Sequence, residues 1–230
     1  MVFPDQTKTF KRFVTNKSNR FARSVLTSTI QNLFGPYRFV IIYGTKSTGK
    51  SHLLNVFAND VIAVDSGFRP FLIELNDFPE LLNCDTESLA KSDIKIFCIE
   101  DLDQIHAEPD AFNWLTEALL KINEANGQLV ITCNVEKLEI RTLSEWADLF
   151  SCSIMADIAP YGFIEHREIL LEASADARSL STDVVDFIVS SSARDIDQMK
   201  AAIGILTRFS SLRADEITID MARDAIQFPA

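Results

Sequence analysis

Five short apolar runs within the first 160 residues have the length and the flanking residues of buried β-strands. Helical patterns separate the later runs, most clearly at 110–125. Continuously apolar strands that alternate with helices are typical of a parallel sheet covered by helices. The pattern therefore predicts an α/β fold. The expected strands are 38–43, 70–75, 94–99, 128–133 and 153–158.

Helical spacing of apolar residues begins earlier, at 18–33, where Phe34-Gly35-Pro36 ends the pattern, and a further helix is expected from about Lys50. After Ala159-Pro160-Tyr161-Gly162 no strand-like run follows. We therefore expect a domain boundary near residue 160, with an αβα base domain at 1–160 and a small all-helical domain at 161–230. The expected helices of the second domain are 163–177, 181–192 with Ser181 or Thr182 as N-cap, 193–211 and 217–228.

The charge of the chain limits its partners. A net charge of -11 over 230 residues argues against a large nucleic-acid-binding surface, and we expect no direct sequence-specific DNA binding. The first 50 residues are the exception, because basic residues there outnumber acidic ones. This excess of basic residues is consistent either with local anion binding or with a solvated helix face.

Cellular context follows from what the sequence lacks. No apolar stretch is long enough to span a bilayer, and MVFPDQTKTFKRF has no signal-peptide core, so we expect a cytoplasmic protein without a membrane partner. The cysteines form no CxxC pair and the histidines show no metal-ligand spacing. We interpret the cysteines as reduced core residues. The cysteines are Cys84, Cys98, Cys133 and Cys152, and the histidines are His52, His106 and His166.

The stretch GTKSTGKS at 44–51 is a glycine-rich loop of the form GxxxxGK[ST] between a predicted strand and a predicted helix. Gly44 and Gly49 let backbone N–H groups point inward at phosphates, Lys50 neutralises the outer phosphates, and Ser51 offers a hydroxyl to Mg2+. This context favours nucleotide binding over a chance glycine turn. The other loop residues expected to surround the nucleotide are Thr45, Lys46, Ser47 and Thr48.

An acidic pair, Glu100 and Asp101, follows the apolar run IKIFCI. A P-loop protein needs a carboxylate at such a strand end to orient the metal, and a second one often polarises the attacking water. Here the longer acid comes first, so binding should survive more easily than hydrolysis. The alternative is that both carboxylates are merely exposed at a strand end.

Two further polar residues could approach the phosphates. Asn134 follows the fourth expected strand, and Arg194 opens a helix of the second domain beside Asp195. Each signal is weak alone, since Asn is common at strand ends and a helix-surface Arg is usually solvated. The catalytic candidates are therefore Glu100, Asp101, Asn134 and Arg194, with Ser51 and Glu100 as metal candidates.

Several blocks, in order, resemble the DnaA-type AAA+ ATPases over nearly the whole chain. The resemblance implies an AAA+ P-loop NTPase fold, a parallel αβα sheet followed by a helical lid. It also implies that Phe13, Val14 and Asn19 border the adenine and ribose of ATP or ADP, that Asn134 is sensor 1 and that Arg194 is sensor 2. The blocks are TFKRFVTNKSNRFARS at 9–24, GTKSTGKSHLLN, IFCIEDLDQI as Walker B, LVITCNVEKLEI, IMADIAPYGFIEHREIL and ARDIDQMKAAI.

Within that family the chain looks like the Hda type, which acts with the DNA polymerase III sliding clamp to make DnaA hydrolyse its ATP. The chain ends at Ala230, without room for the DNA-binding domain of DnaA, and only about 16 residues separate Asp77 from Ile94, too few for the helical insertion of DnaA initiators. The partners that this resemblance implies are DnaA and the sliding clamp.

Three positions depart from the Hda pattern. MVFPDQTKTF lacks the expected clamp-binding peptide, Glu100-Asp101 reverses the usual acidic order, and the arginine-finger position falls at or near Leu149, with only Arg141 nearby. We therefore expect tight nucleotide binding with slow or absent intrinsic hydrolysis. The alternatives are a self-assembling helicase-loader-type ATPase, which would be a homo-oligomer, and a diverged interaction scaffold. Four aromatic residues are interpreted either as partner contacts or as core residues. They are Phe3, Phe10, Trp146 and Phe150.

Overall fold

A computed structural model describes residues 4–83, 86, 94–134, 153–174, 180–192, 195–213 and 217–227. The chain forms two compact units, Met1–Ala159 and Pro160–Ala230. None of the described helices is both long enough and apolar enough to cross a membrane.

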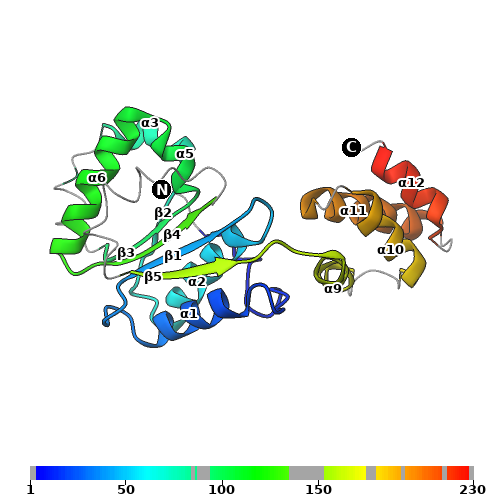
Figure 1. The fold of residues 1–230 in the computed structure, drawn as a ribbon, viewed down its shortest axis with the longest axis horizontal. Helices are drawn as coiled ribbons and strands as arrows, with labels where there is room; N and C mark the ends of the chain where they lie inside the picture. Colours follow the sequence, from blue (N-terminus) through cyan, green and yellow to red (C-terminus); the bar gives the residue numbers. More distant parts are fainter. Residues whose placement is uncertain are drawn as a thin grey trace. The chain divides into compact units, whose positions relative to one another are not determined.

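The first unit is built on a five-stranded sheet in the order β2-β3-β4-β1-β5, and every neighbouring pair is parallel (Figure 1). This confirms the predicted α/β fold with a parallel sheet. β4 lies between β1 and β3, so the ends of these three strands meet at one edge of the sheet. The strands are β1 (Phe39–Gly44), β2 (Phe71–Ile73), β3 (Ile96–Ile99), β4 (Gln128–Cys133) and β5 (Ile154–Ile158).

The second strand is shorter than the run at 70–75 predicts. β2 ends at Ile73, because the Asp77 carboxylate accepts a hydrogen bond from the Glu74 amide at 2.9 Å and so turns the chain into the short 3-10 helix η1 (Leu75–Asp77). Hydrogen bonds between a nearby Asp side chain and the backbone compete with strand pairing.

Helices cover both faces of the sheet (Figure 1). Alternate strand residues such as Phe39 and Ile41 pack with Trp114, Leu115 and Leu119 of α6 in one buried cluster. The helices α1 and α2 lie on the opposite face. The bounds are α1 (Arg20–Gln31), α2 (Lys50–Val64), α3 (Phe78–Leu81), α5 (Leu102–His106) and α6 (Pro109–Glu124).

The second unit consists, in its described part, of four helices around their own apolar core. Leu170, Val185, Met199 and Leu206 are among its buried residues. An ion pair between the Arg167 Nε and the Asp186 carboxylate, at 2.7 Å, joins the first two helices. The helices are α9 (Phe163–Ala173), α10 (Thr182–Ser191), α11 (Ile196–Arg213) and α12 (Ile219–Gln227).

Helix starts in this unit follow polar residues. Ser181 occupies the N-cap position of α10 in an extended conformation, as one of the two expected candidates. α11 begins at Ile196, later than the expected 193, because the Asp195 carboxylate accepts hydrogen bonds from the Asp197 and Gln198 amides. Arg194 lies outside the described residues.

Candidate nucleotide-binding site

The glycine-rich loop joins β1 to α2, and its backbone conformation requires its glycines. A Cβ atom at Gly44 would lie 2.5 Å from the Ile158 carbonyl oxygen, so no larger residue fits there. Gly49 has φ 87° and is the N-cap of α2. Glycine adopts such left-handed backbone at little steric cost. The loop can therefore turn its N–H groups and the N-terminus of α2 toward an anion.

Lys50 lies inside this loop and is 4% exposed. Its Nζ donates hydrogen bonds to the Gly44 carbonyl at 3.0 Å and to the Thr45 carbonyl at 2.7 Å. Burial lowers the pKa of Lys50, while the nearby Asp101 and other acidic groups act to raise it. The loop thus surrounds a buried amino group with several carboxylates nearby. The amino group can neutralise a phosphate, and the carboxylates can bind a divalent cation.

Ser51 and Glu100 meet across this edge of the sheet. Glu100 directly follows β3, and its amide donates to the Ile73 carbonyl at 2.9 Å. Burial raises the pKa of Glu100, and a hydrogen bond with the Ser51 side chain acts in the opposite direction. A hydroxyl and a carboxylate in contact offer the oxygen donors that Mg2+ prefers. The residues present therefore suit the metal that the sequence predicts.

Asp101 sits in a tight turn. Its φ is 47°, its amide donates to the Thr132 hydroxyl at 3.0 Å, and its carboxylate accepts from the Gln104 side chain at 3.0 Å. Asp tolerates left-handed backbone better than most residues do. The second acid of the pair is thus partly engaged in shaping the turn, whereas Glu100 contacts the loop serine.

Asn134, at the end of β4, is 6% exposed and is held by Asp103. Its amide donates to Asp103 Oδ1 at 2.8 Å, and its Nδ2 donates to both carboxylate oxygens at 3.2 and 3.1 Å. Sequence reasoning missed Asp103. The available signal was a third acid in IEDLDQ, at the start of the short helix α5.

The three residues expected near the adenine and ribose lie on one N-terminal segment. Phe13 is buried and contacts the His52 ring edge-on, with centroids 5.3 Å apart. Asn19 is fully buried, and its Nδ2 donates to the Val14 carbonyl at 2.9 Å while its Oδ1 accepts from the Asn16 amide at 2.9 Å. Asn19 therefore fixes the conformation of the 14–19 loop.

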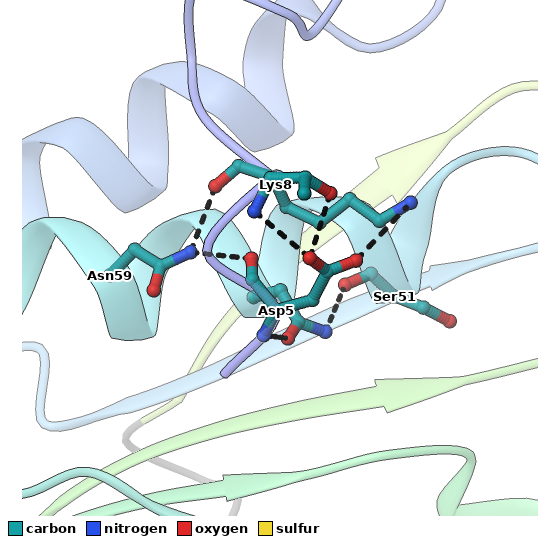
Figure 2. Close-up of polar contacts among 6 residues, drawn as sticks. Asp5, Lys8, Ser51 and Asn59 are labelled. Atoms are coloured by element: carbon teal, nitrogen blue, oxygen red, sulfur yellow. Dashed lines mark hydrogen bonds and ion pairs between the residues drawn. The ribbon is translucent and has the colours of Figure 1, made fainter. Parts of the chain in front are cut away.

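The N-terminal segment is fastened to the helix that carries Lys50 and Ser51 (Figure 2). The Asn59 side chain donates to the Asp5 carbonyl at 2.8 Å and to the Lys8 carbonyl at 2.9 Å. Asn55 accepts from the Asp5 amide at 2.8 Å and donates to the Ser51 carbonyl at 3.0 Å. Sequence reasoning missed this clasp, whose signal is two asparagines one helical turn apart.

Lys50, Ser51, Glu100 and Asn134 thus gather at one edge of the sheet, while the 13–19 segment and α2 are joined by the asparagine clasp. Several other residues named from the sequence lie beyond the part of the chain that the structure describes. Those outside the described residues are Phe3, Cys84, Arg141, Trp146, Leu149, Phe150, Cys152 and Arg194.

Cys98 and Cys133 are buried free cysteines, and burial raises the pKa of Cys133 to about 12.

A glycine-rich loop at the tip of β1, facing an acidic pair at the tip of β3 in this strand order, defines a P-loop domain of the AAA+ class. The family model of the bacterial DnaA ATPase domain matches residues 5–149, and the chain belongs to this family.

Individual relatives agree with this assignment. The chromosomal replication initiator DnaA of Geobacter sulfurreducens is 30% identical over 228 residues, which cover 95% of this chain and 51% of that protein. The chain thus spans about half the length of the DnaA relatives that it matches. Domain III of Thermotoga maritima DnaA superposes with a TM-score of 0.83 at 20% identity, covering 98% of each chain. AMPPCP-bound DnaA from Aquifex aeolicus gives a TM-score of 0.73 at 18% identity, covering 97% of this chain and 72% of that one.

Proposed function

We propose that this protein binds ATP or ADP and regulates the initiation of bacterial chromosome replication in the manner of Hda, through direct contact with DnaA. Membership of the DnaA ATPase-domain family supports a role related to replication initiation. The single observation that carries the nucleotide part is the buried Lys50 amino group inside a loop shaped by Gly44. The sliding clamp is the second partner in this proposal.

The nucleotide would occupy the edge where β1, β3 and β4 end. The loop residues 44–51 would hold its phosphates, and Ser51 and Glu100 would hold Mg2+, which would neutralise phosphate charge. Phe13 and Val14 would border the adenine, with Asn19 fixing the loop that contains Val14. Residues 1–160 would then be the base domain, and 161–230 a lid that contributes Arg194 as sensor 2.

Intrinsic hydrolysis is proposed to be slow or absent. Glu100 stands where a shorter acid usually orients the metal, and the Asp101 carboxylate already accepts a hydrogen bond from Gln104. Placing a lytic water demands sub-ångström positioning, whereas binding tolerates such changes. The protein would therefore act as a nucleotide-gated binding module, in which ligand-dependent closure alters the surface offered to a partner.

Nucleotide binding is tested with a fluorescent ADP analogue titrated into the wild-type protein and Lys50→Ala. Removing the buried ammonium should abolish binding at micromolar concentrations, because Lys50 is the cation held inside the loop by the Gly44 and Thr45 carbonyls. The matched control is Lys95→Ala, since Lys95 is an exposed lysine just before β3. Micromolar binding retained in Lys50→Ala would refute the assignment of the loop.

The regulatory role is tested by following ATP conversion to ADP on the cognate DnaA, with and without this protein and a DNA-loaded clamp. Acceleration that requires this protein, and that is lost in Lys50→Ala, is the expected result. Nucleotide binding without acceleration would favour the diverged scaffold. ATP hydrolysis by this protein alone, rising with its concentration as oligomers form, would favour the helicase-loader-type ATPase.

A further inference from the structure

We infer that Asp103 is a positioning residue that fixes the Asn134 side chain for recognition of the terminal phosphate; this inference rests on the proposed nucleotide-binding function. Asp103 lies in α5, and Asn134 directly follows β4. Asp103 is 7% exposed and Asn134 is 6% exposed. The two residues are 31 positions apart in the sequence, so their contact is made by the fold.

The contact satisfies a buried carboxylate. An unpaired carboxylate inside a protein is costly unless several hydrogen bonds stabilise it. Among the described residues, Asn134 supplies the hydrogen bonds that this carboxylate accepts, one from its backbone amide and two from Nδ2. Asp103 thus depends on Asn134, and Asn134 in turn is held by both its backbone and its side chain.

The contact also decides which way the amide faces. An ionised carboxylate only accepts hydrogen bonds, so the Asn134 nitrogen must point toward Asp103 and the carbonyl oxygen must point away. Without such a partner the two ends of an amide are nearly equivalent in shape, and the side chain can flip. The amide nitrogen carries two hydrogens, so while it donates to Asp103 it can also donate to a phosphate oxygen, which the acceptor Oδ1 of a flipped side chain could not do.

A second hydrogen bond keeps this frame rigid. The Asp101 amide donates to the Thr132 hydroxyl at 3.0 Å, so the turn after β3 is joined to β4 on both sides of Cys133. The site lies close by, because Cys133, the residue before Asn134, pairs with Tyr43, the residue before Gly44 of the loop. Because these hydrogen bonds already order the Asn134 side chain, binding a terminal phosphate costs little further side-chain entropy.

The residue is tested by the ratio of the dissociation constants for ADP and ATP, measured with the full chain and Mg2+. The variants are Asp103→Asn, Asn134→Ala and the double variant. Asp103→Asn keeps the shape of the side chain while it allows the facing amide to flip. It should change the ratio by about fivefold or more in the wild-type background and by less than about twofold in Asn134→Ala, since a positioning residue acts only through its partner.

Charge and position are separable in this design. If Asp103 acted through its charge alone, removing that charge would change the ADP/ATP ratio whether or not Asn134 is present. An equal change of the ratio in both backgrounds would therefore overturn the inference. Asp157→Asn is the matched control, because Asp157 is an exposed carboxylate in β5. It should leave the ratio unchanged. If Asp103→Asn does not fold, combining it with Asn134→Asp keeps one carboxylate facing one amide, and this reversed pair should weaken ATP binding more than ADP binding.

A measurement without nucleotide separates this inference from the proposed function. The Asn134 side-chain amide protons, assigned by their absence in Asn134→Ala, should exchange with solvent more slowly in the wild-type protein than in Asp103→Asn. Wild-type protein that binds no nucleotide would refute the proposed function and this inference with it. Nucleotide binding with a ratio unchanged in Asp103→Asn, or equal affinity of the wild type for ATP and ADP, would refute the role of Asp103 alone.

Discussion

The Thr132 hydroxyl accepts a hydrogen bond from the Asp101 backbone amide at 3.0 Å and so links the end of β4 to the turn that follows β3. Thr132 is fully buried, and Asp101 has the left-handed φ of 47°. Replacing Thr132 by Val keeps the shape and removes the acceptor. Leaving this amide unsatisfied should cost about 1–3 kcal/mol in the free energy of unfolding, measured by urea denaturation.

Thr132→Ser is the control for that change, since serine retains the hydroxyl and should recover most of the loss. A loss in Thr132→Ser with none in Thr132→Val would show that the methyl group matters and the hydrogen bond does not.

Gly44 is expected to reject any side chain. In Gly44→Ala the new Cβ would meet the Ile158 carbonyl oxygen, which lies 2.5 Å from its ideal position, and backbone on both sides cannot easily move. We expect a loss of about 1–3 kcal/mol in unfolding free energy, typical of overpacking. Gly204 of α11 is the contrasting position, because nothing lies within 4 Å of its added Cβ. Gly204→Ala should stabilise its helix by about 0.5–1 kcal/mol, and a comparable loss at both sites would contradict the steric account.

Glu100 should make stability depend on pH. Burial raises its pKa above the ordinary value of 4.5, so the folded chain binds this proton more tightly than the unfolded chain does. Its contribution is therefore fully favourable below pH 4.5 and is lost as the pH rises through the folded-state pKa. Glu100→Gln should raise the stability near pH 7.5 and change it little near pH 4, as measured by urea denaturation at about these two values.

The exposed Glu168 provides the comparison for this pH test. Glu168→Gln should show no such difference between the two pH values. A stability gain in Glu100→Gln that is the same at both would mean that the carboxylate charge is not the cause.

The asparagine clasp should control how tightly the N-terminal segment is held. Asn59→Ala removes one donor from two backbone carbonyls, those of Asp5 and Lys8, each bond being worth about 0.5–1.5 kcal/mol. We expect faster tryptic cleavage after Lys8 and Lys11 through local opening, and weaker nucleotide binding because Phe13 lies on the same segment. Asn83→Ala is the control, since Asn83 bonds within its own turn, to Pro79. Unchanged cleavage in Asn59→Ala would show that other contacts hold the segment.

Much of this architecture could be predicted because its signals are local. The apolar run at 128–133 coincides with β4, and the run at 153–158 differs from β5 by one residue at its start. A buried strand needs consecutive apolar residues, which the sequence displays directly. The glycines at 44 and 49 were equally readable, because a glycine-rich loop between strand and helix is a contiguous pattern. Local competition for the backbone also explains the errors, as at Asp77 and Asp195.

The sequence by itself thus determined the five strands in outline, the longer helices and the loop that surrounds Lys50, since each depends on residues close together in the chain. Only the tertiary structure decided that β4 lies between β1 and β3, and hence that Asn134 meets Asp103 across 31 positions. It likewise decided that Asn59 holds Asp5 across 54 positions. Such contacts depend on how elements pack and on the orientation of single side chains, and no local periodicity records either.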